Sequence, residues 1–364
     1  MSERAQEAIR RAIADHGPIS FAEFMEIALY GPGGFYEDPP IGKGGHFVTS
    51  PHVHPIFGEL VGLALRSMWD LLGRPAPFRM LEFGAGDGTL AGQILDSLRD
   101  VPTSYLAVER SPGARASLAE LAVRGVLTVP SLEVVDQHFT GCVLANELFD
   151  NLPFRLVQGM PGGPAEIRVG VKRGRIVTID RPLDPAVLVD YPLPASWLLH
   201  EVGVIQLDAV HLLERMARMI ARGYTLVVDY AWAGKSTPPH GYRGHQVVER
   251  LLDDPGSSDI TAGVDFEALQ ARARELGLNV FPPVSQRGAL LALGFGTWFE
   301  RERHRQVDAL ERREGREAVR TWSERNEAGL LVSPDGLGRL RWMVLATPGM
   351  PWPEWLEEAA RLDR

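Results

Sequence analysis

MLEFGAGDGTL, residues 80–90, is the stretch that decides the fold of this chain. A short apolar run carries Glu82 near its end, and three glycines follow at alternate positions, Gly84, Gly86 and Gly88. A strand that turns into a helix through such a loop brings its backbone close to a ligand, because glycine has no side chain to hold the ligand away. We therefore predict a strand–loop–helix binding site here, the alternative being an ordinary tight turn without a ligand.

The acidic residues around this loop indicate the chemistry of the ligand. Glu82 at the end of the predicted strand and Asp87 inside the loop would repel a pyrophosphate, and the G-x-G-x-G spacing differs from that of a dinucleotide site. Both carboxylates suit a ligand with an ammonium or sulfonium group, and S-adenosylmethionine carries both. Its own carboxylate can meet N–H groups at the helix start. Glu109, which ends the next predicted strand, can accept both ribose hydroxyls.

Strands and helices alternate from residue 79 onward. The predicted strands are RMLEF (79–83), SYLAVE (104–109), VLTV (126–129), GCVLAN (141–146) and TLVVDY (225–230). This alternation predicts an α/β fold with a mostly parallel sheet. After Pro153, the runs FRLVQ, AEIRVGV and RIVTID predict antiparallel strands joined by turns at PGG and KRG. A helix over 204–222 that stops at Gly223 is predicted to lead back into the sheet.

The chain divides into four parts on this pattern. We expect N-terminal helices and a cofactor-covering loop (1–75), the α/β domain (76–153 and 204–346), a β-rich insertion (154–203) and a C-terminal tail (347–364). The Gly- and aromatic-rich stretch 33–51 is predicted to close as a lid, a plain surface connection being the alternative. Residues 300–327 carry mixed charges, which predicts a solvated helix.

A second candidate site is LANELFDNLP, residues 144–153, directly after the fourth predicted strand. The carboxyl edge of an open α/β sheet is where ligands bind, and one helical turn there would bring Glu147 and Asp150 onto one side. We predict that Glu147, Asp150 and Asn146 are catalytic residues. The alternative is a helix start, with Asn146 as the N-cap and the two acids in the first turn.

Composition narrows the class of protein. The 364 residues carry a net charge of −9, which argues against nucleic acid and suits a cationic substrate. A single cysteine, Cys142, excludes an intrachain disulfide, and it is predicted to be a small buried residue. The first residues lack the apolar core of a signal peptide, and no apolar run is long enough to span a bilayer. We expect a soluble, cytoplasmic protein.

At this point the motifs resemble a known family. The blocks FAEFMEIALYGPGGFY, GGHFVTSPHVHPIFGEL, LEFGAGDGTL, LANELFDNLP, GYRGH and DITAGVDFEAL are similar to the MidA / complex I assembly factor family, over nearly the whole chain. These DUF185-type proteins are S-adenosylmethionine-dependent methyltransferases, and the mitochondrial members are protein-arginine methyltransferases. The family more often has Pro and Arg where this chain has Ala85 and Asp87, and often Glu where it has His52.

The resemblance implies a class I, Rossmann-like methyltransferase that uses S-adenosyl-L-methionine. It implies a protein substrate methylated on arginine, such as a respiratory complex subunit, and a homodimer is a further option. Alternatives are a small-molecule O- or N-methyltransferase, or a cofactor-binding assembly factor without turnover. Besides Glu82 and the three glycines, the expected cofactor-binding residues are Phe47, Thr49, Ala85, Thr89, Glu109, Arg110, Ser131, Leu132 and Asn146.

Two histidines raise the question of a metal. His52 and His54 form an H-x-H pair of a kind that can bind zinc, but no third ligand stands nearby in the sequence, so we predict no metal site. His46 is instead expected to line the loop over the cofactor.

Overall fold

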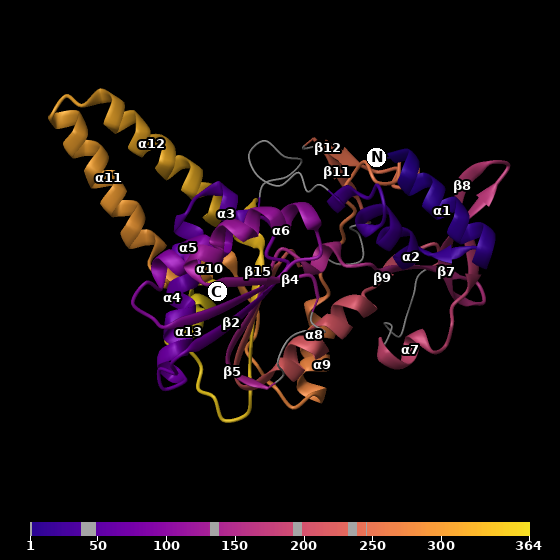
Figure 1. Cartoon of the computed structure of the whole chain (residues 1–364), viewed down its shortest axis with the longest axis horizontal. Coiled ribbons are helices and arrows are strands. Elements are labelled where there is room, and N and C mark those ends of the chain that lie inside the picture. Colours follow the sequence, from indigo (N-terminus) through magenta and orange to yellow (C-terminus); the bar gives the residue numbers. More distant parts are fainter. Residues whose placement is uncertain (1, 38–48, 132–137, 192–198, 232–238, 245) are drawn as a thin grey trace.

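A computed structural model describes residues 2–37, 49–131, 138–191, 199–231, 239–244 and 246–364 (Figure 1). Its central feature is an eight-stranded sheet in the order β13-β15-β10-β5-β2-β3-β4, with β14 also paired to β15. The strands of this sheet are β2 (Phe78–Phe83), β3 (Thr103–Val108), β4 (Val126–Val129), β5 (Phe139–Asn146), β10 (Ile220–Asp229), β13 (Asn279–Val280), β14 (Val284–Ser285) and β15 (Arg341–Ala346). The run from β4 to β10 is parallel, and β15 is antiparallel to β10. The predicted α/β fold is confirmed.

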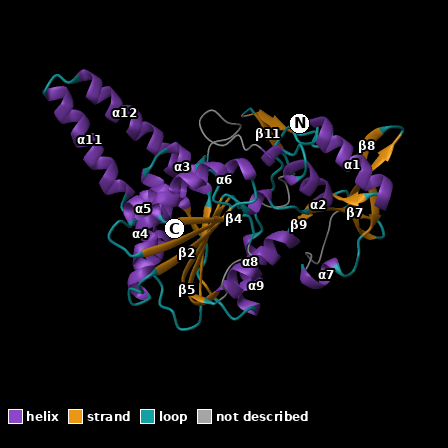
Figure 2. Cartoon of the chain, in the orientation of Figure 1, coloured by secondary structure: helices purple, strands orange, loops and turns teal. Residues whose placement is uncertain are grey.

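Helices cover both faces of this sheet (Figure 2). One face packs against α4 (Ile56–Leu71), α5 (Thr89–Ser97), α10 (Gln286–Ala292) and α13 (Glu354–Leu362), and the other against α8 (Leu207–Met219) and α9 (Phe266–Glu275). Consecutive strand residues alternate between the two cores: Met80 and Leu144 join the first, whereas Leu81 and Val143 join the second. Because the parallel strands are buried on both faces, they read as continuous apolar runs in the sequence.

The structure requires glycine at position 223 for a reason other than the predicted helix stop. The helix α8 ends at Met219, and Gly223 lies inside β10 with φ 156°, so the prediction of a helix stop is wrong. A Cβ on Gly223 would stand 1.8 Å from the carbonyl oxygen of Gly141 on β5. Glycine is therefore required by the close approach of two paired strands.

A second sheet joins the N-terminus to the inserted strands. Its order is β1-β7-β6-β9, with β8 paired to β7 and every pairing antiparallel. Its strands are β1 (Ile19–Ser20), β6 (Arg155–Met160), β7 (Gly163–Lys172), β8 (Arg175–Pro182) and β9 (Val202–Ile205), and α1 (Ser2–His16) and α2 (Phe21–Met25) pack with it. The predicted turns at PGG and KRG are confirmed. Ile19 pairs with Val169, so the first residues and the insertion share one core.

The remaining elements are short or peripheral. They are α3 (Ser50–Val53), α6 (Pro112–Leu118), α7 (Val187–Asp190), β11 (Gly241–Arg243) and β12 (Gln246–Val248). Residues 300–327 belong to two helices instead of one, α11 (Phe295–Glu311) and α12 (Gly315–Gly329), which form a projecting hairpin (Figure 1). The segment predicted as a tail holds α13, whose Leu356 is fully buried in the main core. The four-part division of the chain stays a prediction.

No described helix has the length and apolar character needed to cross a membrane.

Candidate functional site

A cavity of about 920 Å³ lies at the carboxyl ends of the parallel strands. It is lined by the glycine loop after β2, by the ends of β3 and β5, and by residues of the N-terminal part. The lining includes most of the predicted site residues, namely Thr49, Glu82, Gly84, Ala85, Gly86, Glu109, Arg110, Ser131, Asn146 and Glu147. Both candidate sites found in the sequence therefore open into one space, at the edge where α/β sheets bind ligands.

The glycine loop has the backbone conformation that its sequence predicts. Gly84, Gly86 and Gly88 have φ values of 67°, 55° and 86°, all in the left-handed region that favours glycine. The helix α5 begins at Thr89, whose N–H donates to Asp87 Oδ1 at 3.0 Å. The N–H groups of Gly84, Ala85, Gly86, Gly88 and Thr89 all donate to acceptors of the chain itself, and these bonds hold the loop in this conformation.

Glu82 is a buried carboxyl group at the end of β2. It is 2% exposed, and Oε2 accepts a hydrogen bond of 2.7 Å from the hydroxyl of Tyr105. Burial raises the pKa of Glu82 to about 7; the bond from Tyr105 lowers the pKa, and the charges of Glu109 and Asp87 raise it. A buried carboxylate with so high a pKa gains stability when a cation is placed beside it.

Glu109 ties the glycine loop to the end of β3. Its Oε2 accepts from Gly86 N at 2.9 Å, and its Oε1 accepts from Ser111 N at 2.8 Å. Burial raises the pKa of Glu109 against these hydrogen bonds. The neighbouring Arg110 forms an ion pair with Glu26 and lies over the Tyr30 ring, 4.2 Å from its centroid. Arg110 thus holds the N-terminal part against the edge of the cavity.

His52 and Asp87 contact each other across the cavity rim. His52 Nε2 lies 2.9 Å from Asp87 Oδ2, and His52 Nδ1 lies 2.8 Å from Thr49 Oγ1. Burial would raise the pKa of Asp87, but the bonds from His52 and Thr89 outweigh it and lower the pKa to about 2. Two positions at which the chain departs from the family pattern therefore form one pair, which joins α3 to the glycine loop.

Glu147 lies beyond the last residue of β5, in a conformation that the sequence did not predict. Its φ is 50°, and its N–H donates to the carbonyl of Val228 at 2.8 Å. Glu147 Oε1 accepts from Ser50 N at 2.8 Å and from Asn146 Nδ2 at 3.2 Å. Burial raises the pKa of Glu147, while the bonds from Ser50 and Asn146 lower it. Glu147 lines the cavity together with Asn146.

Asp150 does not join Glu147, so the predicted helical turn is wrong. Residues Phe149–Asn151 form a single 3₁₀ turn, and Asp150 Oδ2 accepts from Thr261 Oγ1 at 3.0 Å. Asp150 is not among the described residues that line the cavity. Burial and the charge of Asp229 raise the pKa of Asp150 well above its usual range. The helix-start alternative is also wrong, because no α-helix begins at Asn146.

Asp229 sets the shape of this loop and was missed in the sequence. It is fully buried at the end of β10, and Oδ2 accepts from the N–H groups of Leu148 and Phe149 at 3.0 and 2.7 Å. Burial raises the pKa of Asp229 to about 7, against the backbone hydrogen bonds, the first of them from Tyr230. A carboxylate that receives two successive N–H groups fixes the turn that aims Glu147 into the cavity. Its only sequence signal was an acid at the end of a predicted strand.

A second missed group joins the N-terminal part to the same loop. Tyr36 donates to Asp259 Oδ1 at 2.9 Å, and Asn151 Nδ2 donates to the same oxygen at 2.9 Å. Tyr30 donates to the carbonyl of Asn151 at 3.1 Å. Burial raises the pKa of Asp259 to about 6, although both side-chain hydrogen bonds lower it. Tyr30, Tyr36 and Asn151 all line the cavity.

The two histidines of the H-x-H pair have separate surroundings. His54 Nδ1 accepts from Ile56 N at 3.1 Å, and its ring packs against that of Trp298, 5.0 Å between centroids. Among the described residues, no group of three His, Cys, Asp or Glu is placed to hold a metal ion. Cys142 is buried, as predicted. Phe47, Leu132, His46 and most of the predicted lid lie outside the described residues.

Comparisons with known proteins agree with this geometry. Residues 60–284 match a family model described as an S-adenosyl-L-methionine-dependent methyltransferase. The chain is 32% identical to the protein arginine methyltransferase NDUFAF7 homolog, mitochondrial, of Drosophila melanogaster, over 76% of this chain and 72% of that protein. It is 30% identical to the human protein of that name, over 72% of this chain and 67% of the relative. A Burkholderia thailandensis protein crystallised with S-adenosyl-homocysteine has a TM-score of 0.81 at 26% identity, covering 98% and 94% of the two chains.

These names correct one expectation. A cytoplasmic location was expected from the composition and the first residues. The curated relatives from fly, zebrafish and human are named mitochondrial, which contradicts that expectation. The physical reason for the error is that net charge and a single cysteine describe redox and solubility conditions that several compartments share.

Proposed function

We propose, on the premise that this chain belongs to the family of S-adenosyl-L-methionine-dependent methyltransferases, that it methylates an arginine side chain of a protein. The cofactor of the family is S-adenosyl-L-methionine, which supplies an electrophilic methyl group. The observation that carries the arginine proposal is the pair of acceptors, Glu147 and Asn146, which line the same cavity as the glycine loop. The names of the relatives support the same substrate.

The polar groups that line the cavity match the charged and hydroxyl groups of S-adenosyl-L-methionine. We assign the amino group to Glu82, whose raised pKa calls for a cation, and the ribose hydroxyls to Glu109. The ligand's carboxylate would lie near the N-terminus of α5, where the positive end of the helix dipole favours an anion. Ala85, Arg110 and Ser131 also line the cavity, as does Thr49 at the N-cap of α3. Gly88 and Thr89 are not among the described lining residues, so their contact with the cofactor stays a prediction. Phe47 and Leu132 stay predictions.

The acceptors at the end of β5 suit a guanidinium group. Arginine presents five N–H donors in a planar fork and stays charged at neutral pH. Glu147 and Asn146 line the cavity, and Asn146 Oδ1 is buried and unpartnered among the described residues. As the arginine nitrogen takes the methyl group it must lose one proton, and Glu147 Oε2 would accept it. The raised pKa of Glu147 favours that transfer.

Asp150 takes a supporting role in this scheme. Its hydrogen bond to Thr261 and its burial away from the cavity argue against contact with the substrate. We assign to it, together with Asp229, the positioning of the loop that carries Glu147. Methylation of a respiratory complex subunit and a homodimeric state stay predictions.

A methyl-transfer assay tests the proposed function against its alternatives. The full chain is incubated with methyl-labelled S-adenosyl-L-methionine and a cell extract, and the products are separated by size. Label in protein bands supports the proposal. Label only in low-mass material would favour a small-molecule methyltransferase, and no transfer at all would favour an assembly factor without turnover.

Binding of S-adenosylhomocysteine should weaken at acidic pH. Because the pKa of Glu82 is about 7 without ligand, the carboxylate is mostly protonated at pH 6 and mostly ionised at pH 8. An ammonium partner requires the ionised form, so we expect about tenfold weaker binding at pH 6 than at pH 8. Calorimetry at both pH values measures this. Glu82→Gln should bind weakly with no such slope, and an equal slope in this variant would assign the effect to another group.

Asp229→Asn should slow methyl transfer and leave cofactor binding largely intact. The amide keeps the volume but loses the charge that receives Leu148 N and Phe149 N, so Glu147 is less well held. We expect turnover to fall about tenfold, the Kd for S-adenosylhomocysteine to change less than about threefold, and the melting temperature to drop. Asp253→Asn, at an exposed surface ion pair, is the matched control. Unchanged turnover with a lowered melting temperature would make Asp229 purely structural.

A further inference from the structure

The short helix α3 lies between the glycine loop and the end of β5, and it contacts both. Its N-cap residue, Thr49, lines the cavity, and so does His52 within the helix. A helix of four residues has too few internal hydrogen bonds to be stable on its own. The orientation of α3 must therefore come from its contacts with neighbouring elements.

One contact of α3 reaches the carboxyl group of Glu147. Ser50 N donates to Glu147 Oε1 at 2.8 Å, and Ser50 is fully buried. The Ser50 hydroxyl lies 3.5 Å from Oε1 of Gln286, a fully buried residue of α10. Because the N–H group of Ser50 points at Glu147, a shift of α3 would move or release this carboxyl group.

A second contact of α3 reaches the glycine loop. His52 Nε2 lies 2.9 Å from Asp87 Oδ2 and 3.3 Å from Thr89 Oγ1 at the start of α5. Asp87 is ionised at neutral pH, since its pKa is about 2, and hydrogen bonds to charged groups are the stronger kind. The His52 side chain is only 13% exposed, so its surroundings strengthen the bond further.

A third contact joins α3 to α5. Gln93 Nε2 on α5 donates to the carbonyl of Pro51 at 2.9 Å. The glycine loop leads directly into α5, so the contacts of His52 and Pro51 attach α3 to one continuous loop–helix unit. Ser50 then connects this unit to Glu147 at the end of β5.

The N-cap of α3 is used for the histidine instead of for the helix. A threonine at this position usually accepts a hydrogen bond from an N–H group of the first turn. In the described part of the chain Thr49 makes no such bond, and its Oγ1 lies 2.8 Å from His52 Nδ1. Both ring nitrogens of His52 are thus engaged. This arrangement fixes the ring and argues against His52 as a base that takes a proton from the substrate.

We propose that His52 is a positioning residue for Glu147. Its pair with Asp87 fixes α3, and α3 directs the N–H group of Ser50 to the Glu147 carboxyl group. The carboxyl group and the cofactor loop are then held at a set distance, because both are attached to the same turn. A misplacement of about 1 Å can cost about 100-fold in rate, so this distance matters for methyl transfer. The inference rests on the proposed methyltransferase function.

His52→Ala should slow single-turnover methyl transfer about tenfold, while the Kd for S-adenosylhomocysteine changes less than about threefold. His52→Gln keeps an N–H group that can reach Asp87, and it should recover turnover to within about threefold of wild type. Thermal melting measures the folded fraction of each variant. Wild-type turnover in His52→Ala, with only a lower melting temperature, would overturn the proposal.

A double-mutant cycle tests whether His52 acts through Asp87. In an Asp87→Ala background, His52→Ala should change turnover by less than about twofold, because its partner is already absent. A further loss of about tenfold in that background would overturn the proposal, since His52 would then act through another group.

Amide exchange of Ser50, followed by NMR, reports on the contact with Glu147 without any turnover. His52→Ala should speed this exchange about tenfold or more, and so should Glu147→Ala. Unchanged exchange in His52→Ala would overturn the proposal. A wild-type protein that transfers no methyl group would refute the proposed function, and faster Ser50 exchange in His52→Ala would then still support the positioning of Glu147.

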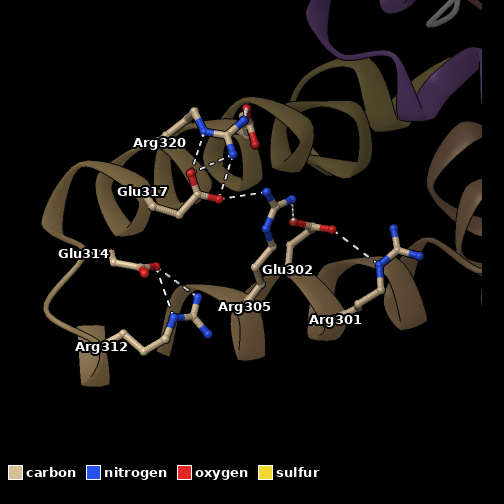
Figure 3. A network of polar contacts seen from close by, with 8 residues as sticks. Arg301, Glu302, Arg305, Arg312, Glu314, Glu317 and Arg320 are labelled. Atoms are coloured by element: carbon tan, nitrogen blue, oxygen red, sulfur yellow. Dashed lines mark hydrogen bonds and ion pairs between the residues drawn. The ribbon is translucent and has the colours of Figure 1, made fainter. Parts of the chain in front are cut away.

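Two controls separate the loss of this pair from a general loss of stability. His54→Ala removes the same type of side chain two positions further on, outside the described lining of the cavity. Arg312→Ala removes an ion pair of 3.0 Å with Glu314 in the projecting hairpin (Figure 3). Both variants should keep turnover and Ser50 exchange within about twofold of wild type. Losses in these controls equal to those in His52→Ala would overturn the proposal.

Discussion

Glu147→Gln is expected to reduce single-turnover methyl transfer by about 10²-fold or more. The amide keeps the size of the side chain and can still accept the N–H of Ser50, which holds α3 in place. What it loses is the negative charge facing the cavity, and with it the capacity to hold a guanidinium and take its proton. Rates measured with saturating cofactor isolate this step from cofactor binding.

The same variant should leave cofactor binding within about twofold, since Glu82 and Glu109 remain. Glu120→Gln, an exposed acid in the segment after α6, is the matched control and should behave as wild type. If Glu147 only anchored α3 through its hydrogen bond from Ser50 N, the variant would affect stability and not turnover. Wild-type rates in Glu147→Gln, with only a lower melting temperature, would leave the catalytic acid unassigned.

Gly86→Val is expected to abolish binding of S-adenosylhomocysteine, with a loss of at least about 100-fold. Gly86 has φ 55°, a conformation that valine adopts only with strain, and its N–H is held by Glu109 at 2.9 Å. Gly86 also lines the cavity, so a branched side chain would occupy space that the ligand needs. Calorimetry with S-adenosylhomocysteine measures the loss directly.

A control must distinguish two effects of Gly86→Val, namely backbone strain at a positive φ and the filling of space that the ligand needs. Gly125 has φ 83°, and an added Cβ there would meet nothing within 4 Å, away from the cavity. Gly125→Val therefore imposes similar strain with no steric contact to ligand, and it should bind as wild type after correction for the folded fraction. Binding by Gly86→Val within about threefold of wild type would contradict the proposed cofactor position.

The parallel sheet was readable from the sequence because its strands are buried on both faces. Continuous apolar runs such as RMLEF and TLVVDY mark them, and the glycine spacing marks the loop. The pairing of Ile19 with Val169 was not readable, since a two-residue strand has no periodicity of its own. The burial of Leu356 in the main core also depends on partners far away in sequence.

The sequence predicted which residue types form the site, but it did not predict how all of them are arranged. Local spacing favoured a helical turn with Glu147 and Asp150 together. Asp229, about 80 residues further on, decides otherwise, because it receives Leu148 N and Phe149 N. The contact between His52 and Asp87 is likewise long-range, and each residue alone looked like a departure from the family pattern. Buried contacts between residues far apart in the sequence therefore override the local preference for a helical turn.

The measurement that tests the central claim most directly is amino-acid analysis of the labelled product. Protein methylated by the purified chain with methyl-labelled S-adenosyl-L-methionine is hydrolysed, and the labelled residues are identified. The account predicts that the label is in methylarginine and that Glu147→Gln removes it. Label in another amino acid, or methylarginine formed equally well by Glu147→Gln, would contradict it.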